Sequence, residues 1–312
     1  MKSYISCDNN SKPVSGIGQC SIDYISVMDE FPMENTKLEI TPYKIFGGGP
    51  VATALVTLSR FGVKTKFMGV ISDDDAGLMI KEGLIKEGVD VLHIIEVPNK
   101  RSQTAFILVN KHNAKRTIFW SKPTAIIENI FLPLDFIIGS ALLHLDGFMF
   151  DISMSAALIA RKNQIPIMID IGSFSEQRYE IVKISDYVVC SEIFSNVFSD
   201  GDHEKTIKKL IGNGSKIATV TLGTRGSLTA VDNKIIHQPA YSVAAVDTTG
   251  AGDVFHGAYI YGIINKWDIV DTLKLAASSA ALKCLKLGGR DGIPDIETAI
   301  NFINQKNITF NH

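Results

Sequence analysis

The 312-residue sequence has few of the features that mark small secreted, membrane-spanning or nucleic-acid-binding proteins. Its four cysteines, Cys7, Cys20, Cys190 and Cys284, form no CxxC pair, which argues against a disulfide framework or a zinc ribbon. No apolar run approaches the roughly 20 residues that span a membrane. Basic and acidic residues number 31 and 33, so the basic excess of a nucleic-acid binder is missing. Because a secretory signal pattern is also missing, we expect a cytoplasmic protein with no membrane or nucleic-acid partner.

Hydrophobic patterning predicts strands that alternate with helices. Residues spaced i, i+3, i+4, i+7 predict one helix that begins near Val51 and another over 273–284 behind a cap at Asp271. Short apolar runs predict strands at 64–71, 141–145, 165–171, 187–190 and 217–222. Such alternation is typical of an α/β fold with a doubly wound, mostly parallel sheet that is flanked by helices.

One segment, 102–121, differs because its residues alternate as in a β-hairpin. Together with 18–27 and 37–46 it could form a small separate β-sheet. A small sheet that projects from a doubly wound core is suited to cover a cleft, and we expect it to act as a lid. The sequence therefore predicts a single domain over 14–312, preceded by a flexible N-terminus over 1–13.

The segment 246–259 carries the strongest chemical signal. Its glycines lead directly into helical spacing, so Gly250, Ala251 and Gly252 are predicted to form the first turn of a helix. The free N–H groups and the positive dipole end of such a turn bind anions. Asp253 lies in the same turn, where a carboxylate could act as a base in phosphoryl transfer to a hydroxyl. A simple helix cap would explain an isolated GAGD equally well.

Two further segments place glycines where a ligand could approach the backbone. Residues 46–55 put three glycines before a helix with Pro50 in its first turn, which suits a polyhydroxylated ligand or a tight strand–helix connection. Residues 219–228 end a strand in a loop with Gly223 and Gly226, which suits a nucleotide or a plain turn. No GxxxxGK[ST] sequence occurs, and this excludes a Walker-type P-loop.

In this order the segments resemble the PfkB/ribokinase family of carbohydrate kinases, over about residues 14–294. The resemblance rests on the glycine-rich segment 47–62 and on 247–253, which follows a TLGxxG strand. The tail 280–294, together with the GGGP start, is most similar to the subgroup that includes sulfofructose kinase. The resemblance implies a ribokinase-like fold and a kinase that uses ATP and Mg²⁺, and in many members K⁺, to phosphorylate a small furanose or ketose-type sugar. A nucleoside kinase and a non-catalytic nucleotide- or sugar-binding regulator are the alternatives.

The resemblance also implies roles for individual residues. Asp253 corresponds to the catalytic base, and Gly250, Ala251 and Gly252 to the anion hole. The residues that correspond to the acceptor site are Asp23, Gly47 and Gly48. The residues that correspond to the nucleotide loop are Thr221, Gly223 and Gly226. The residues whose backbone carbonyls correspond to a potassium site are Asp247, Thr249, Lys283 and Gly288.

The sequence departs from the family pattern at three positions. Ala52 stands where many members have a sugar-binding asparagine, which we interpret as a change of acceptor. The NxxE element appears as Ser191–Phe194, in which Glu192 is out of register but could reach a water on the metal of the nucleotide. Gly292 stands where ribokinase-like members have a potassium-binding serine, and this weakens the potassium prediction.

Several residues have weaker signals. Lys37 precedes an expected lid strand and could reach an anionic acceptor, although such a lysine is commonly solvated. Asp170 ends a strand and is a candidate for the floor of the active site, whereas His256 is expected on a helix face. The resemblance implies a homodimer through the lid, where Phe119 and Trp120 are expected to pack in the interface or the core.

Overall fold

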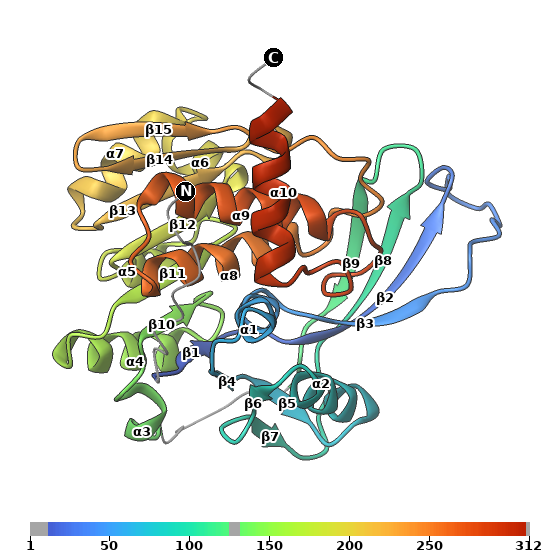
Figure 1. Ribbon diagram of the computed structural model, residues 1–312. Helices are drawn as coiled ribbons and strands as arrows, with labels where there is room; N and C mark the ends of the chain where they lie inside the picture. Colours follow the sequence, from blue (N-terminus) through green and yellow to red (C-terminus); the bar gives the residue numbers. More distant parts are fainter. Residues whose placement is uncertain (1–11, 125–131, 310–312) are drawn as a thin grey trace.

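The computed structural model describes residues 12–124 and 132–309. Figure 1 shows a large sheet with helices on both faces and a small sheet that projects from one end. The predicted α/β class is therefore confirmed. Most of the N-terminus that we expected to be flexible lies outside the described residues. Among the helices of the described ranges, none combines the length and the apolar character that a membrane span requires.

The large sheet has nine strands in the order β15–β14–β13–β12–β11–β10–β1–β4–β6. The strands from β13 to β6 run parallel, and β14 and β15 complete one edge in antiparallel orientation. Their bounds are β1 Val14–Ile17, β4 Thr65–Met68, β6 Val89–Asp90, β10 Leu142–Leu145, β11 Ile167–Ile171, β12 Tyr187–Ser191, β13 Ile217–Thr221, β14 Ser227–Val231 and β15 Lys234–Gln238. Both faces are buried, since Met168 of β11 packs in one core while Ile167 and Ile169 pack in the other. This explains the continuous apolar run of that strand.

Two layers of helices cover the sheet (Figure 1). Helices α1, α2, α8 and α9 form one layer around Leu55 and Tyr259, and α10 lies against α9. Helices α4 to α7 form the other layer around Phe194 and Leu210. The helix bounds are α1 Pro50–Arg60, α2 Asp75–Lys86, α3 Leu134–Ile137, α4 Phe150–Lys162, α5 Glu176–Val182, α6 Glu192–Ser199, α7 His203–Gly212, α8 Ala251–Ile264, α9 Ile269–Lys283 and α10 Ile296–Thr309.

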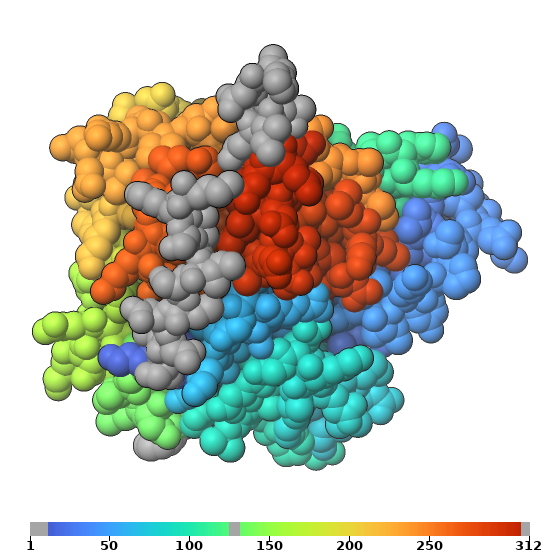
Figure 2. Space-filling view, viewed as in Figure 1, coloured from blue at the N-terminus to red at the C-terminus, as the bar shows by residue number. Residues whose placement is uncertain are grey.

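The small sheet, called the lid below, has the strand order β3–β2–β8–β9. Its strands are β2 Ser21–Met28, β3 Lys44–Gly48, β8 Thr104–Asn110 and β9 Arg116–Ser121. In the space-filling view its blue and green residues extend from the body at the right (Figure 2). The hairpin predicted over 102–121 corresponds to β8 and β9. The strand expected over 37–46 is shorter, because β3 begins at Lys44 and residues 37–43 lie in the exposed connection from β2.

Other differences from the predicted elements have local causes. The strand expected over 64–71 is divided at Gly69 into β4 and β5 (Val70–Ser72), and β5 pairs with β7 (Ile95–Val97) outside the large sheet. Helix α9 is capped by Asp268 and not by Asp271, because the Asp268 carboxylate accepts a hydrogen bond from the Asp271 N–H at 3.0 Å. Strands β1, β14 and β15 were not predicted, since they are short and β14 and β15 contain several polar residues.

Candidate active site

The amino end of α8 has the open backbone that the sequence predicts. Gly250 caps the helix with φ 75°, a left-handed conformation that a side chain would strain. A Cβ at Gly250 would also lie 2.8 Å from the carbonyl oxygen of Gly289. Ala251 and Gly252 begin the helix, and no heavy atom lies within 4 Å of where a Cβ of Gly252 would be. An anion can therefore approach the backbone N–H groups of this turn closely.

The helix start shares a pocket of about 500 Å³ with the loop that follows β13. Thr221, Gly223 and Gly226 of this loop line the pocket together with Gly252. Gly226 has φ 88°, and a Cβ there would collide with the Gln238 carbonyl, so the loop requires glycine at this position. The structure thus joins the predicted nucleotide loop to the predicted anion hole.

The far wall of this pocket is built from small and apolar side chains. The residues that form it are Val243, Phe255, Ala277, Ala280, Ala281 and Cys284. Alanines at 277, 280 and 281 come from α9, where a helix with short side chains leaves room for a flat group. The lining of the pocket therefore combines small apolar side chains with the free backbone N–H groups of the α8 turn, and a nucleotide needs both.

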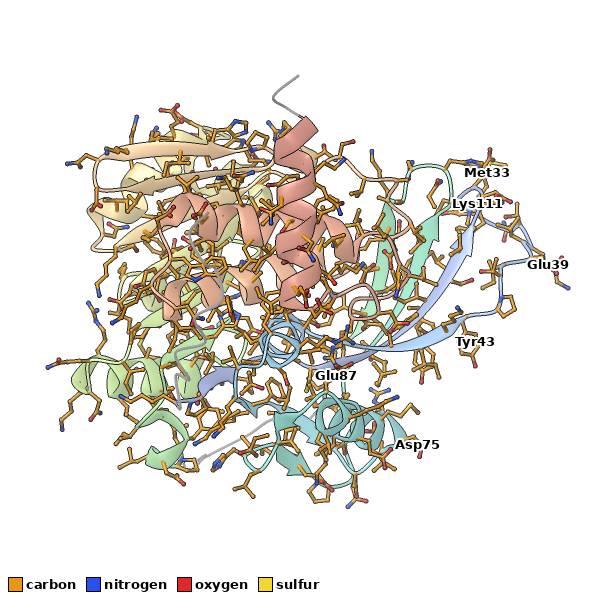
Figure 3. All side chains as sticks on the ribbon, in the orientation of Figure 1. Met33, Glu39, Tyr43, Asp75, Glu87 and Lys111 are labelled. Atoms are coloured by element: carbon orange, nitrogen blue, oxygen red, sulfur yellow. The ribbon has the colours of Figure 1, made fainter. Side chains whose placement is uncertain are left out.

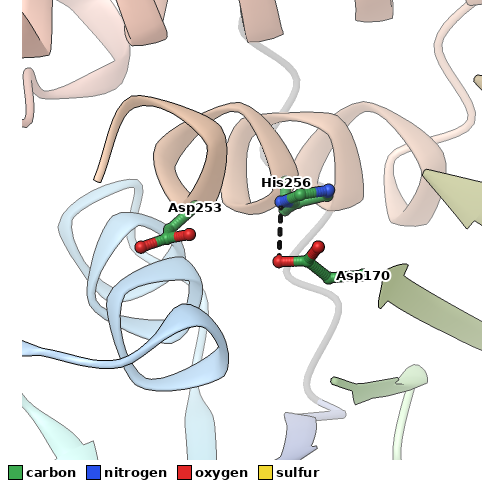
Figure 4. Close-up of side chains that lie close together, drawn as sticks. All are labelled: Asp170, Asp253 and His256. Atoms are coloured by element: carbon green, nitrogen blue, oxygen red, sulfur yellow. Dashed lines mark ion pairs between the residues drawn. The ribbon is translucent and has the colours of Figure 1, made fainter. Parts of the chain in front are cut away.

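Figure 4 shows an acid–histidine cluster behind the same helix turn. Asp253 lies in the first turn of α8, His256 follows on the same helix, and Asp170 comes from β11. The Nδ1 atom of His256 lies 3.2 Å from Oδ2 of Asp170. One donor atom from each of the three residues lies within 4.8 Å of the other two. The side chain of His256 is only 5% exposed. It is therefore part of the cluster and not a surface residue of the helix.

Burial controls the protonation of this cluster. Burial raises the pKa of Asp253 to about 6, and the neighbouring Asp170 adds to the rise, whereas His256, Arg116 and Lys283 oppose it. Burial likewise raises the pKa of Asp170 to about 7 and lowers the pKa of His256 to about 4. At neutral pH His256 is therefore uncharged and Asp253 is mostly ionised. A carboxylate with a pKa just below the working pH is suited to act as a general base.

The predicted acceptor residues meet on the other side of this helix turn. Ser21 Oγ donates a hydrogen bond to Oδ1 of Asp23 at 2.8 Å. A Cβ at Gly48 would collide with the Asp23 carboxylate, which explains the glycine at this position. Burial raises the pKa of Asp23 to about 6; Ser21 and Arg290 oppose the rise, and the charge of Asp253 adds to it. Asp253 is therefore close enough for its charge to influence the pKa of Asp23.

Arg290 is a site residue that the sequence analysis missed. Its guanidinium is buried, and Nη2 donates to the Gly48 carbonyl at 2.8 Å. The same guanidinium occupies the space that a Cβ of Gly47 would need, so Gly47 makes room for an arginine and not directly for a ligand. The signal in the sequence is an arginine directly after Gly288 and Gly289, within the tail 280–294.

The lid brings two further side chains towards this cleft. Trp120, Ala105 and Asp23 are paired across the lid, which puts all three side chains on one face of the sheet. Trp120 is therefore in the same row as the acceptor aspartate. At the start of β9, Nη1 of Arg116 donates to Oγ1 of Thr248 at 3.0 Å, just before the α8 turn. The lid thus contacts the loop that carries the candidate base.

Two predicted residues are not part of this cluster. Lys37 is exposed in the β2–β3 connection, and its neighbours Met33 and Glu39 lie at the outer end of the lid in Figure 3. The structure does not bring Lys37 together with Asp23 and Asp253. Glu192 begins α6 and forms an ion pair with Arg225 of the loop after β13, so it lies beside the nucleotide loop.

The four residues predicted to form a potassium site do come together. Asp247 Oδ1 accepts hydrogen bonds from the Thr249 N–H at 2.8 Å and the Thr249 hydroxyl at 2.7 Å. Asp247 Oδ2 accepts from the Gly288 N–H at 2.8 Å. Lys283 takes part through its side chain, because Nζ donates to the Asp247 carbonyl at 2.8 Å. The role predicted for Lys283 concerned its backbone carbonyl, and this contact of the side chain adds to that prediction.

The chain has a doubly wound α/β fold, and comparison with known proteins gives the family. Residues 12–296 match the pfkB family carbohydrate kinases, and the chain belongs to that family. It is 23% identical to a ribokinase of Haemophilus influenzae over 94% of this chain and 98% of the relative. It is 26% identical to a 5-dehydro-2-deoxygluconokinase of Clostridium botulinum over 93% of this chain and 92% of the relative. A structure of Arabidopsis thaliana ribokinase complexed with ribose and ATP has a TM-score of 0.81 at 21% identity, covering 94% of this chain and 98% of that chain.

Proposed function

We propose that this carbohydrate kinase transfers the terminal phosphate of ATP to a hydroxyl of a small sugar of furanose or ketose type, with Asp253 as the general base. One observation carries the proposal: the Gly250–Gly252 turn and the Thr221–Gly226 loop open into the same pocket, and Asp253 lies in that turn. The relatives named ribokinase and 5-dehydro-2-deoxygluconokinase support a sugar acceptor.

The proposed reaction assigns each part of the site a task. The adenine of ATP lies against the small apolar side chains of the pocket, and the γ-phosphate meets the N–H groups of the α8 turn. The sugar lies between Asp23, which accepts hydrogen bonds from its hydroxyls, and Asp253. Asp253 removes the proton of the attacking hydroxyl as the new O–P bond forms and the bond to ADP breaks. The N–H groups, together with Arg116 at the same turn, stabilise the charge on the transferred group.

The residues beside the nucleotide loop also fit a divalent cation. Mg²⁺ on a nucleotide keeps several waters and needs only one or two protein carboxylates. Arg225 binds Oε1 of Glu192, and Oε2 is the atom that would accept a hydrogen bond from a water on the ion. When bound, Mg²⁺ neutralises charge on the phosphates during transfer.

A panel of acceptors tests the proposal, with ADP release in a coupled assay as the measurement. The panel contains pentoses, hexoses, keto sugar acids, sulfosugars and nucleosides; the sulfosugars are included because the tail 280–294 resembles the sulfofructose kinase subgroup. We expect ADP release with at least one sugar or sugar acid and none with nucleosides. Turnover with nucleosides alone would replace the proposal by a nucleoside kinase, and ATP binding without turnover of any acceptor would indicate a non-catalytic regulator.

We also propose that the protein forms a homodimer through the outer face of the lid. Ile45, Tyr24, Phe106 and Phe119 form one row across the four strands, on the face opposite Asp23. Phe106 is 59% exposed and Phe119 is 51% exposed, although both are large and apolar. The rings of Tyr24 and Phe106 stack at 5.1 Å, so the row forms a continuous apolar surface. A surface of this kind favours a protein–protein contact.

Sedimentation velocity tests the dimer. We expect the wild-type protein to sediment as a dimer and Phe106→Glu to sediment as a monomer, because the variant would bury an unpaired charge on both sides of a symmetric contact. Leu158→Glu, which changes an equally exposed leucine on α4, is the matched control and should remain dimeric. A monomeric wild-type protein, or a Phe106→Glu dimer, would contradict the proposal.

A further inference from the structure

The most unusual charge in the structure is the ammonium group of Lys283, the last residue of α9. Lys283 is 0% exposed and is among the largest fully buried side chains. A buried charge is costly unless neighbouring groups compensate it. Its Nζ donates to the Asp247 carbonyl at 2.8 Å, across 36 residues of sequence. The lysine therefore fixes a backbone carbonyl only three residues before the Gly250 cap.

This hydrogen bond is one of several that join the 246–249 loop to the carboxyl end of α9. The Cys284 carbonyl accepts hydrogen bonds from the Val246 N–H at 2.7 Å and the Asp247 N–H at 3.2 Å. The Asp247 carboxylate is already bonded to Thr249 and to the Gly288 N–H. The Lys283 ammonium thus binds a carbonyl of this loop, beside the carboxyl end of a helix whose dipole favours a cation.

The groups around Lys283 shift its pKa in both directions. Burial lowers the pKa of Lys283; Asp247, the Cys284 thiol and Asp253 oppose this, while Arg116 adds to the lowering. Two carboxylates are therefore close enough to favour the protonated form. Those carboxylates are the loop aspartate and the candidate base.

We propose that the Lys283 ammonium takes the place of a monovalent metal ion in this loop, so that the enzyme needs no potassium. Potassium binds to rings of backbone carbonyls, and the Asp247 carbonyl was predicted to be one such ligand. In this chain that carbonyl already holds a cation of the same charge, and a second cation beside it would be repelled. The Lys283 carbonyl, another of the four predicted ligands, accepts the Lys286 N–H at 3.3 Å and packs against Gly292. The residues present therefore do not fit a bound K⁺.

Lys283 is accordingly a positioning residue. It does not touch the substrates, but it holds the 247–249 loop from which the α8 turn begins. If a cation is needed there, loss of the ammonium should be repaired by a metal ion that can enter the space it leaves. The kinetic consequence rests on the proposed function, whereas ion binding at this place does not.

The kinetic test compares salts at equal ionic strength, with tetramethylammonium as a cation too large for the site. We expect wild-type kcat to be equal in potassium and tetramethylammonium chloride. Lys283→Met should lose ~10-fold or more of kcat in tetramethylammonium, with a smaller change in KM for ATP, and K⁺ should restore most of the loss. Lys274→Met, on the same helix but partly exposed in an ion pair with Asp271, is the control and should show neither effect.

A thermal test on the protein without substrates is independent of catalysis. We expect the Tm of the wild-type protein to be the same in the two salts, and the Tm of Lys283→Met to be lower and to rise in K⁺. Activation or thermal stabilisation of the wild-type protein by K⁺ would overturn the inference, as would a Lys283→Met enzyme that is fully active without K⁺. If Lys283→Met does not fold, the wild-type comparison in the two salts decides alone. If the wild-type protein is inactive with every acceptor, the proposed function is wrong, but the thermal test still decides whether the site binds K⁺.

Discussion

Asp253→Asn is expected to lower kcat by at least ~10²-fold, the usual contribution of a positioned general base. Asparagine keeps the size of the side chain but does not take a proton from the attacking hydroxyl. The N–H groups of Gly250, Ala251 and Gly252 are unchanged, so ATP should still bind at the α8 turn. The measurement is steady-state ADP release with the best acceptor of the panel, combined with ATP affinity from calorimetry.

Two comparisons make this result specific to the base. Asp75→Asn changes an exposed aspartate that also begins a helix, α2 (Figure 3), and should leave kcat unchanged. The folded-state pKa of Asp253, about 6, lies above its ordinary value of 3.8, so the stability of the wild-type protein falls as the pH rises from about 4 to 6 and stays lower above pH 6. Asp253→Asn should therefore have a higher Tm than the wild-type protein at pH 8, and the gain should vanish near pH 4. Near-normal turnover in a folded Asp253→Asn enzyme would show that Asp253 is not the general base.

The dependence of kcat/KM on pH is a second test of the role of Asp253. Burial raises the pKa of both Asp23 and Asp253 to about 6, so both carboxylates gain a proton as the pH falls through that value. Both carboxylates must be ionised for the proposed reaction, so protonation of either one lowers the rate. We expect kcat/KM for the sugar to fall below pH 6 with a slope steeper than the tenfold per pH unit of a single group. A profile that is flat to pH 5 would contradict both assignments.

The elements that the sequence predicted best are those that depend on neighbouring residues. The turn Gly250–Asp253 combines glycines with helical spacing directly after it, and both signals lie within one segment. The same holds for Pro50 in the first turn of α1 and for the hairpin of β8 and β9. In these cases local conformational preference and tertiary packing favour the same structure, so the local signal is enough to predict it.

The parts that the sequence did not predict depend on contacts between distant residues. Nothing near Lys283 indicates whether its carbonyl or its ammonium will face Asp247, because that depends on how α9 packs against the 246–249 loop. The position of the Arg290 guanidinium beside Gly47 likewise depends on how β3 packs against the tail 280–294. Lys37 was expected in a lid strand, but the strand begins seven residues later, at Lys44. A shift of this size moves a side chain from the cleft to the outer end of the lid.

Asp23→Ala is expected to lower kcat/KM for the sugar by about 10²- to 10⁴-fold. A buried carboxylate that accepts hydrogen bonds from two sugar hydroxyls contributes about 1.5–3 kcal/mol for each of them. Asp23 is held for this task by the Ser21 hydroxyl and lies close enough to the Arg290 guanidinium for the two charges to interact. The measurement is the dependence of initial rate on sugar concentration at saturating ATP.

The matched variants separate acceptor binding from damage to the lid. Ser21→Ala removes only the hydrogen bond at 2.8 Å that orients Asp23, and should cost about 10-fold or less. Asp29→Ala changes an exposed aspartate at the end of β2 that pairs with Lys111, and should have no effect. Since Asp23 lies on the acceptor side of Asp253, the KM for ATP should stay the same in all three variants. A loss in Asp23→Ala that appears equally in the KM for ATP would show that the lid had shifted as a whole, and a fully active Asp23→Ala enzyme would place the sugar elsewhere in the cleft.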